Sequence, residues 1–560
     1  MPRETRAGTL LAPADHVLAV AGLLGLIVAL WAPFGLPVGP TFEEWKGLYW
    51  TVERGGLPVV FPNRPLLFAP YALAHLTGRP LEALNLMQAS AMLAKGALVY
   101  LLVVRLLPGS GALAFLAGAL TIVYPADTGF FTLRTVSQHL AVALCLLAIH
   151  LLLSLRRRFQ WWRLLAVWIV QAMSLSLHAV SIPLLLASPV LLVWQERRLT
   201  RRLLLTWAAV AVVPLAFAAV TLAYGLRDDT YEGRNLAHSG LDPGILAAGL
   251  QILGRILAAY VRHFSGGWID ALRELSPGAD VALAITTWAL VVGPALWWLA
   301  RRGPAPRAGQ EVRPYLELAL LALLAMPIGF LLFLPTSWLE RSWRVFYHSS
   351  AAAAVVVAVL CALIAAAAGR WRRLVLAGLG GCLVALGLTA GLAQHRTYAE
   401  WGQGQQRILL GMVQAAPRMQ PETALLLIDV PPYPAVRYWR VCGLVTECVE
   451  LSLRYVYGLR DLEAVFCAPG ETPRRAASET CRFERDHVVV EYRDPRGSDR
   501  RIVRRYPYQR LLVFETSEGR AHLLTDLDRY RAPGVGAAYT PEARIEQAPL
   551  PRLARVMLRP

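Results

Sequence analysis

Long apolar runs separated by short charged loops are the feature that most limits how this chain folds. Runs of about 20 apolar residues recur along the sequence, which is the length that an α-helix needs to cross a membrane. Of the 560 residues, 56% are hydrophobic and 17% are charged, whereas soluble domains carry roughly 25% charged residues. The sequence therefore predicts a polytopic α-helical membrane protein rather than one soluble core.

The formal net charge of +18 comes from arginines that gather in short loops between the apolar runs. These loops are residues 156–163, 197–202, 301–307 and 369–373. Basic residues in short loops mark the cytoplasmic side of a membrane protein, and no nucleic-acid recognition motif accompanies the charge. We therefore predict a multi-pass protein of the cell inner or plasma membrane, with a cytoplasmic N-terminus and no nucleic-acid partner.

Placing the basic loops on the cytoplasmic side leaves a consistent set of about eleven transmembrane helices. They are expected near residues 16–36, 84–104, 111–130, 138–155, 163–179, 181–195, 203–225, 280–300, 314–335, 348–368 and 374–393. The first run is longer than the apolar region of about 7–15 residues in a signal peptide, so we expect it to be retained. An odd number of spans puts everything after residue 395 outside the cytoplasm.

Two further apolar segments do not fit as spans. Residues 64–78 are too few, and they contain prolines. Residues 245–264 place Gln251, Arg255 and Arg262 on one helical face and aliphatic residues on the other. That pattern is typical of a helix that lies in the membrane interface.

The tail at residues 395–560 has a different composition from the preceding membrane domain at 1–394. Long apolar runs end there, and residues 424–430, 487–492 and 510–520 have the pattern of strands. We predict a C-terminal extracytoplasmic mixed α/β domain. Its four cysteines favour disulfides over a zinc site, with Cys442–Cys448 and Cys467–Cys481 preferred by sequence proximity among three connectivities.

Two adjacent carboxylates, Glu43 and Glu44, open the first large outer loop and have aromatic residues around them. A second outer loop supplies Asp127. A carboxylate near the membrane surface can take a proton from an acceptor hydroxyl or amine while a lipid-linked sugar phosphate leaves. The alternative for Glu43 and Glu44 is a solvated loop end without function.

A leaving phosphate needs cationic or hydrogen-bonding partners. The substrate-binding candidates are Arg64, Lys95, Arg134, His139, Arg341, Arg344 and His348. Lys95 falls within a span, where an ionisable residue is a functional candidate by default. The alternative for Lys95 is a lysine that snorkels or pairs within the bundle.

This layout resembles the GT-C superfamily of integral membrane glycosyltransferases over roughly residues 10–395. Phe42-Glu43-Glu44 resembles the Phe-Asp-Glu start of the first outer loop in protein O-mannosyltransferases and bacterial aminoarabinose transferases, with Glu in place of the usual Asp. "SWRVFYHSSAAAA" at 342–354 resembles the family's Arg-Tyr entry to a late span, without its proline. The resemblance implies that Glu43 is the catalytic acid, that Asp127 assists and that Arg344 contacts phosphate, while Glu44 stays an alternative base.

The resulting hypothesis is a glycosyltransferase that moves a sugar from a polyprenyl-phosphate donor to an extracytoplasmic acceptor, which is a glycan, a lipid or a protein. The donor's lipid tail would lie among the spans and contact membrane lipid. No metal ligands are predicted, although two adjacent acids are compatible with a divalent ion. The alternatives are a transporter or lipid flippase for cell-envelope glycan precursors and a non-catalytic assembly protein.

Overall fold

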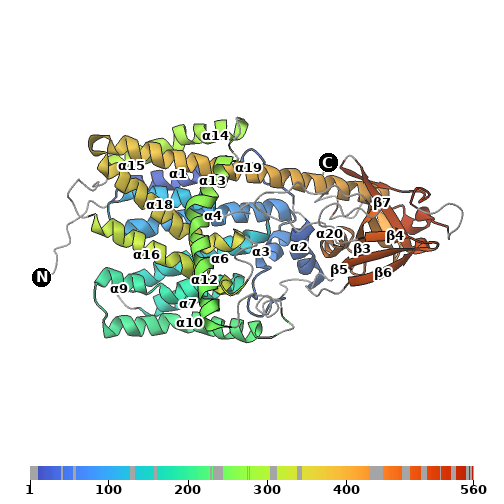
Figure 1. Cartoon of the computed structure of the whole chain (residues 1–560), viewed down its shortest axis with the longest axis horizontal. Coiled ribbons are helices and arrows are strands. Elements are labelled where there is room, and N and C mark those ends of the chain that lie inside the picture. The colour runs from blue at the N-terminus through green and yellow to red at the C-terminus, as the bar shows by residue number, and fades with distance from the viewer. Residues whose placement is uncertain are drawn as a thin grey trace.

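The computed structural model (Figure 1) contains a helical bundle at its N-terminal end and a small sheet domain at its C-terminal end. It describes residues 11–39, 42–54, 59–126, 133–156, 160–227, 230, 244–273, 275, 278–302, 312–336, 343–428, 446–469, 480–493, 501–517, 519–530, 538–549, 554 and 558. Within these ranges, the side chains of residues 42–44, 54, 134, 245, 343–344, 446–449, 466–469 and 492–493 are left undescribed.

Nine helical segments among the described residues are long and apolar enough to cross a membrane. Five are the single helices α1 (Pro13–Trp31), α4 (Pro80–Leu106), α6 (Val136–Ser154), α10 (Arg201–Gly225) and α18 (Tyr347–Ala367). The other four contain α8 (Ile182–Ala187) with α9 (Val190–Glu196), α14 (Ala279–Thr287) with α15 (Gly293–Arg302), α16 (Arg313–Gly329), and α19 (Arg372–Ala415).

The two remaining predicted spans form shorter helices, α5 (Gly111–Val123) and α7 (Trp161–Leu177). Each of the eleven predicted segments therefore contains a helix, and nine of the described helical segments are long and apolar enough for a span. With 13 residues, α5 is only about 20 Å long. Every residue of α5 is buried, because α4, α15, α18 and α19 surround it.

Small residues allow α4 and α5 to approach closely. A Cβ built at Gly118 would lie 2.7 Å from the carbonyl oxygen of Gly96, which is nearer than real Cβ atoms come to backbone. Small residues at helix crossings are how membrane helices gain close van der Waals packing. The position of α5 at the centre of the bundle therefore depends on this pair of glycines.

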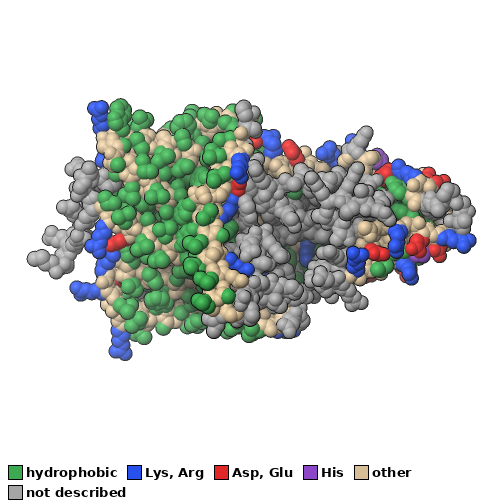
Figure 2. Space-filling view, viewed as in Figure 1, with side chains coloured by type: hydrophobic (Ala, Val, Ile, Leu, Met, Phe, Trp, Pro, Cys, Tyr) green, Lys and Arg blue, Asp and Glu red, His purple; other side chains and the backbone are tan. Residues whose placement is uncertain are grey.

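The arginine-rich loops lie together at one end of the bundle, which we call the arginine end. Arg302 is 3.8 Å from the carboxylate of Asp15, and Arg156 is 3.9 Å from that of Glu196. Figure 2 shows an apolar belt over the bundle with basic side chains at this edge. We call the opposite end, which faces the sheet domain, the domain end.

Helix α12 (Ile245–Val261) matches the predicted interface segment and is not among the nine candidate spans. Figure 1 shows it crossing the bundle at a steep angle to the neighbouring helices. Its exposed apolar residues recur every three or four positions, as Leu246, Leu250, Leu253, Leu257 and Val261. On the protein side, the guanidinium of Arg255 donates to the carbonyl oxygen of Leu334 at 2.7 Å. Helix α12 is thus amphipathic, as its sequence predicts.

Helix α19 joins the bundle to the sheet domain without a break. It has 44 residues and is about 66 Å long, roughly twice the hydrocarbon thickness of a bilayer. The predicted domain boundary after residue 394 lies within this helix. Close packing holds its far end, because a Cβ built at Gly411 would lie 2.7 Å from the carbonyl oxygen of Ala521.

The sheet domain contains a seven-stranded mixed sheet with the strand order β6-β5-β4-β3-β2-β7-β8. The strands are β2 (Ala424–Ile428), β3 (Glu463–Pro469), β4 (Thr480–Phe483), β5 (His487–Arg493), β6 (Arg501–Pro507), β7 (Leu511–Ser517) and β8 (Arg520–Leu523). The three strands expected from sequence are β2, β5 and β7. A separate short ladder pairs β1 (Arg418–Met419) with β9 (Ile545–Glu546).

The central strand β2 is parallel to both β3 and β7 and is buried on both faces. Leu425 and Leu427 join the hydrophobic core that continues into the bundle, while Leu426 and Ile428 face a second core on the other side. Helix α20 (Thr446–Tyr457) connects β2 to β3 and packs against β3. A parallel pair needs such a crossover connection.

The cysteines divide as predicted between the two parts of the chain. Cys145, Cys361 and Cys382 are free thiols in the bundle helices. Cys481 in β4 is disulfide-bonded, and its partner lies outside the described side chains. Strands β3 and β4 are neighbours in register, which places the strand that carries Cys467 beside Cys481.

The arginine distribution predicts which end of the bundle faces the cytoplasm. In intact cells, a membrane-impermeant thiol reagent should label Arg520→Cys in β8 and should label Arg301→Cys only after permeabilisation. The unmodified chain provides the background. Labelling with the reverse sidedness would contradict the predicted orientation.

Strand β4 with Cys481 pairs with β3, the strand that carries Cys467, so the predicted Cys467–Cys481 bond can be tested directly. Peptide mapping without reductant should recover a fragment in which these two residues are linked. Closing a 15-residue loop stabilises by about 3 kcal/mol in the chain-entropy model, so reduction should lower the thermal stability of the sheet domain. Four free thiols in protein purified without reductant would show that the bond is wrong.

Candidate functional site

Glu43 and Glu44 lie in the first turn of helix α2 (Phe42–Arg54), not in the loop that the sequence suggested. The helical period was present, because Trp45, Leu48 and Tyr49 are buried on one face. Consecutive residues of a helix are about 100° apart around its axis, so positions 43 and 44 face different directions. Their own side chains are not described.

The segment that leads into α2 is anchored to two helices of the bundle. The side-chain amide of Asn85 in α4 donates to the carbonyl oxygen of Val38 at 3.1 Å. A Cβ built at Gly402 in α19 would lie 2.8 Å from the carbonyl oxygen of Gly39. These contacts anchor the chain at Val38 and Gly39, and α2 begins three residues after Gly39, at Phe42.

Helix α2 also packs against α20 of the sheet domain (Figure 1). The rings of Trp45 and Tyr455 have centroids 5.2 Å apart, and both side chains are fully buried. Burial raises the pKa of Tyr49, and its hydroxyl interacts with Glu53 in α2 and Arg454 in α20. The sheet domain therefore covers the helix that carries the two predicted carboxylates.

Arg134 lies on a short 3₁₀ turn, η1 (Leu133–Thr135), that contacts α2. The hydroxyl of Tyr398 in α19 accepts a hydrogen bond from the backbone of Leu133 at 3.3 Å. The side-chain amide of Gln88 in α4 donates to the Thr135 hydroxyl at 3.3 Å. The turn is thus held beside the start of α6, although the Arg134 side chain is not described.

Three predicted substrate-binding residues lie together in the interior below η1. Lys95 in α4 and His139 in α6 are fully buried, and His348 in α18 is 6% exposed. Lys95 lies within electrostatic range of both histidines. His139 packs on Tyr347 with ring centroids 4.7 Å apart, and His348 Nε2 is 2.9 Å from the Ser181 hydroxyl. We call Lys95, His139 and His348 the lysine–histidine cluster.

Two other predicted arginines lie in turns near the cluster's helices. The guanidinium of Arg64 is 4.7 Å from the ring centroid of Phe61. Its turn is tied to α7 by a hydrogen bond from Leu66 to the carbonyl of Ser176 at 2.9 Å, and to α6 by one from the Ser137 hydroxyl to the carbonyl of Leu67 at 2.6 Å. Arg344 lies in the 3₁₀ turn η6 (Trp343–Phe346), directly before α18, and its side chain is not described.

Several predicted site positions therefore lie on elements that meet at the domain end or on the cluster below it. They are Glu43, Glu44, Arg64, Lys95, Arg134, His139, Arg344 and His348. Asp127 and Arg341 lie outside the described residues. The hydrogen bonds of Ser181, His263 and Ser349 connect the helices around the cluster. These three residues were not predicted, because no sequence motif distinguishes them.

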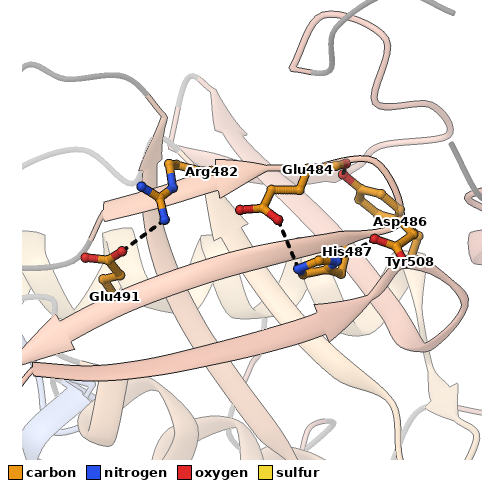
Figure 3. A network of polar contacts seen from close by, with 6 residues as sticks. All are labelled: Arg482, Glu484, Asp486, His487, Glu491 and Tyr508. Atoms are coloured by element: carbon orange, nitrogen blue, oxygen red, sulfur yellow. Dashed lines mark hydrogen bonds and ion pairs between the residues drawn. The ribbon is translucent and has the colours of Figure 1, made fainter. Parts of the chain in front are cut away.

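Other polar groups do not join this arrangement. In the sheet domain, His487 lies between Glu484 at 3.2 Å and Asp486 at 2.5 Å, and the Tyr508 hydroxyl donates to the Glu484 carbonyl (Figure 3). The hydrogen bond with His487 lowers the pKa of Asp486. Asp486 and Glu484 are exposed, so these contacts close the β4–β5 turn in solvent rather than forming a buried site.

Neither a metal centre nor a pocket among the described residues indicates a different functional site. Among the residues that the structure describes, no group of three His, Cys, Asp or Glu could hold a metal ion. A pocket lined in part by Gly109, Leu299 and Arg372 lies at the arginine end, away from the predicted site. In the sheet domain, the acidic pair Asp526 and Asp528 bonds locally, because the backbone of Asp528 donates to the Asp526 carboxylate at 3.3 Å.

Comparison with known proteins does not identify the chain. No protein-family model matches it, and no curated protein matches its sequence.

The contact between Trp45 and Tyr455 predicts that the sheet domain stabilises α2. Removing a buried aromatic side chain costs about 3–5 kcal/mol, so Tyr455→Ala should speed amide hydrogen exchange across α2. Tyr508→Ala is the matched control, because Tyr508 is equally buried but faces the opposite core of the sheet. Equal exchange in α2 for the two variants would show that α20 does not hold this helix.

Proposed function

We propose that the chain is a membrane glycosyltransferase that transfers a sugar from a polyprenyl-phosphate donor to an acceptor outside the cytoplasm. The observation that carries the proposal is the position of α2. Its first turn contains two carboxylates at the domain end of the bundle, and it contacts η1, which carries Arg134. The turn η1 also contacts α4, which carries Lys95 of the lysine–histidine cluster, so both charges that the reaction requires lie on neighbouring elements.

In the proposed reaction, a carboxylate of α2 accepts the proton of an acceptor hydroxyl or amine. The acceptor atom forms a bond to the anomeric carbon of the sugar, and the bond from that carbon to the phosphate oxygen breaks. Polyprenyl phosphate leaves with the bonding electron pair. General-base assistance suits this step because it increases the nucleophilicity of the acceptor as the phosphate departs.

The phosphate would be bound by cationic groups near the start of α18. Arg344 in η6 and Arg134 in η1 are candidates for direct contacts, since arginine can bind phosphate with two parallel hydrogen bonds. Lys95 of the buried cluster would add positive potential from below, with His139 and His348 as hydrogen-bonding groups beside it. Arg64 is a further candidate, and Asp127 and Arg341 stay predictions that the described residues do not address.

The sheet domain would receive the acceptor, since α20 covers α2 while the donor's lipid tail lies among the apolar helices. This separates a polar substrate from a lipidic one. A different role for the two acids is helix stabilisation, because carboxylates in a first turn interact favourably with the helix dipole. That interaction is worth only about 0.3–1 kcal/mol, so the two roles predict different mutant phenotypes.

A transporter or flippase is the second candidate, and the burial of Lys95 in a candidate span is the observation that favours it. Transport of a charged head group would need polar residues along the whole path. Lys95 lies in the middle of α4, and it is grouped with His139 and His348 in the first turns of α6 and α18, which is more consistent with one binding site than with a path.

Glu43→Gln should reduce sugar transfer by about 10²–10⁴-fold, which is the usual cost of losing a general base. Glu44→Gln should cost much less, and Glu43→Asp should retain partial activity. Transfer would be measured in proteoliposomes with polyprenyl-phosphate donors that carry a labelled sugar.

The Glu44→Gln variant controls for loss of charge in the first turn of α2, and thermal unfolding of each variant controls for folding. If Glu44→Gln is the inactive protein, the two acids exchange roles. If both Gln variants transfer sugar at the wild-type rate, the acids serve only the helix terminus and the proposed function fails.

A further inference from the structure

A short π-helical segment, η3 (Arg262–Gly266), links α12 to α13 (Gly267–Arg273). Widened π turns inside helices are rare and occur frequently at functional sites. His263 lies in this segment and is fully buried, although it directly follows the exposed leucine face of α12. Burial, with a smaller contribution from Arg262, lowers the pKa of His263 to about 3, so its imidazole is neutral.

One side of η3 contacts the end of α5. The hydroxyl of Tyr124 donates to the carbonyl oxygen of His263 at 3.0 Å. A Cβ built at Gly267 would lie 2.6 Å from the backbone nitrogen of Ala126, so the two backbones touch. Residues 124–126 are therefore packed directly against η3 and α13.

The other side of η3 contacts the start of α18. His263 Nε2 is 2.9 Å from the hydroxyl of Ser349, and the His263 ring meets that of Phe346 edge-on with centroids 4.9 Å apart. Ser349 donates its own proton to the carbonyl oxygen of Phe346 at 3.0 Å. The Ser349 oxygen must then accept from His263, which assigns the ring proton to Nε2.

The segment is also fixed from the α12 side. Arg262 forms an ion pair with Asp270 one turn into α13, and Arg273 is 3.5 Å from the same carboxylate. Both members of the first pair are largely buried, so the turn cannot rotate without breaking a charge-assisted bond. His263 is thus held from behind while it bonds to α18.

We propose that His263 is a positioning residue that sets the turn η6, and with it Arg344, for the donor's phosphate. The hydrogen bond to Ser349 and the contact with Phe346 hold both ends of the junction between η6 and α18. The same segment, η3, also holds the end of α5. The distance between the end of α5 and the junction of η6 with α18 is therefore fixed. This inference rests on the proposed function only for the identity of the ligand.

The test compares His263→Leu, which removes the donor, with His263→Gln, which keeps an N–H donor near the position of Nε2. The probe is polyprenyl monophosphate without a sugar, and its affinity is measured for the full chain in nanodiscs. Losing one hydrogen bond should weaken binding about threefold to tenfold in His263→Leu, and His263→Gln should restore most of the affinity. Ser349→Ala should match His263→Leu, and the double variant should lose no more than either.

His150→Leu is the matched control, because His150 is a largely buried histidine that bonds the Leu98 carbonyl at 2.8 Å near the arginine end. It should bind the probe like the wild type. A His263→Leu or Ser349→Ala protein with wild-type affinity would overturn the inference.

A second measurement separates this inference from the proposed function. If the wild type does not bind the probe, the proposed function fails. The rate of amide hydrogen exchange at residues 345–350 then tests the positioning role of His263. Exchange there should still be faster in His263→Leu and Ser349→Ala than in His150→Leu. Unchanged exchange there would overturn the positioning role as well.

Discussion

The continuous helix α19 is the element on which the arrangement of the two parts depends. It starts beside the arginine-rich loop at 369–373, passes α5 and α18 in the bundle, and ends against β8 of the sheet domain. A single helix of this length has no hinge at the point where the bundle ends. The packing of α20 on α2 adds a second connection, so the sheet domain is held over the domain end at two places.

Several polar side chains at the domain end are buried and bond to one another. Burying a charged or polar side chain is unfavourable unless other groups compensate, so such groups are retained where they bond to one another or to a ligand. Here the bonds of His348 to Ser181 and of His263 to Ser349 fix the first turn of α18 from two sides. The lysine–histidine cluster reaches this turn through His348, and the positive charge of Lys95 is the basis for placing a phosphate there.

The sequence was sufficient to predict the helices of the bundle, because a run of about 20 apolar residues has few alternatives. It was less sufficient where packing partners are distant in the chain. Hydropathy ended the last span at residue 393, although α19 continues to Ala415 through residues that need no lipid contact. The first turn of α2 was expected to be a loop. The helix is buried by packing against α20, which lies some 400 residues further along the chain, so the local sequence does not reveal this partner. Lys95, His139 and His348 were predicted singly, but only the fold brings them together.

The most direct test of the account is an experimental structure with polyprenyl phosphate bound. The account predicts that the phosphate lies at the domain end, between the first turn of α2 and the η6 turn that carries Arg344, above the lysine–histidine cluster. The lipid chain should leave between apolar helices. A phosphate bound at the arginine end, or remote from both α2 and η6, would contradict the assignment of this region as the site of sugar transfer.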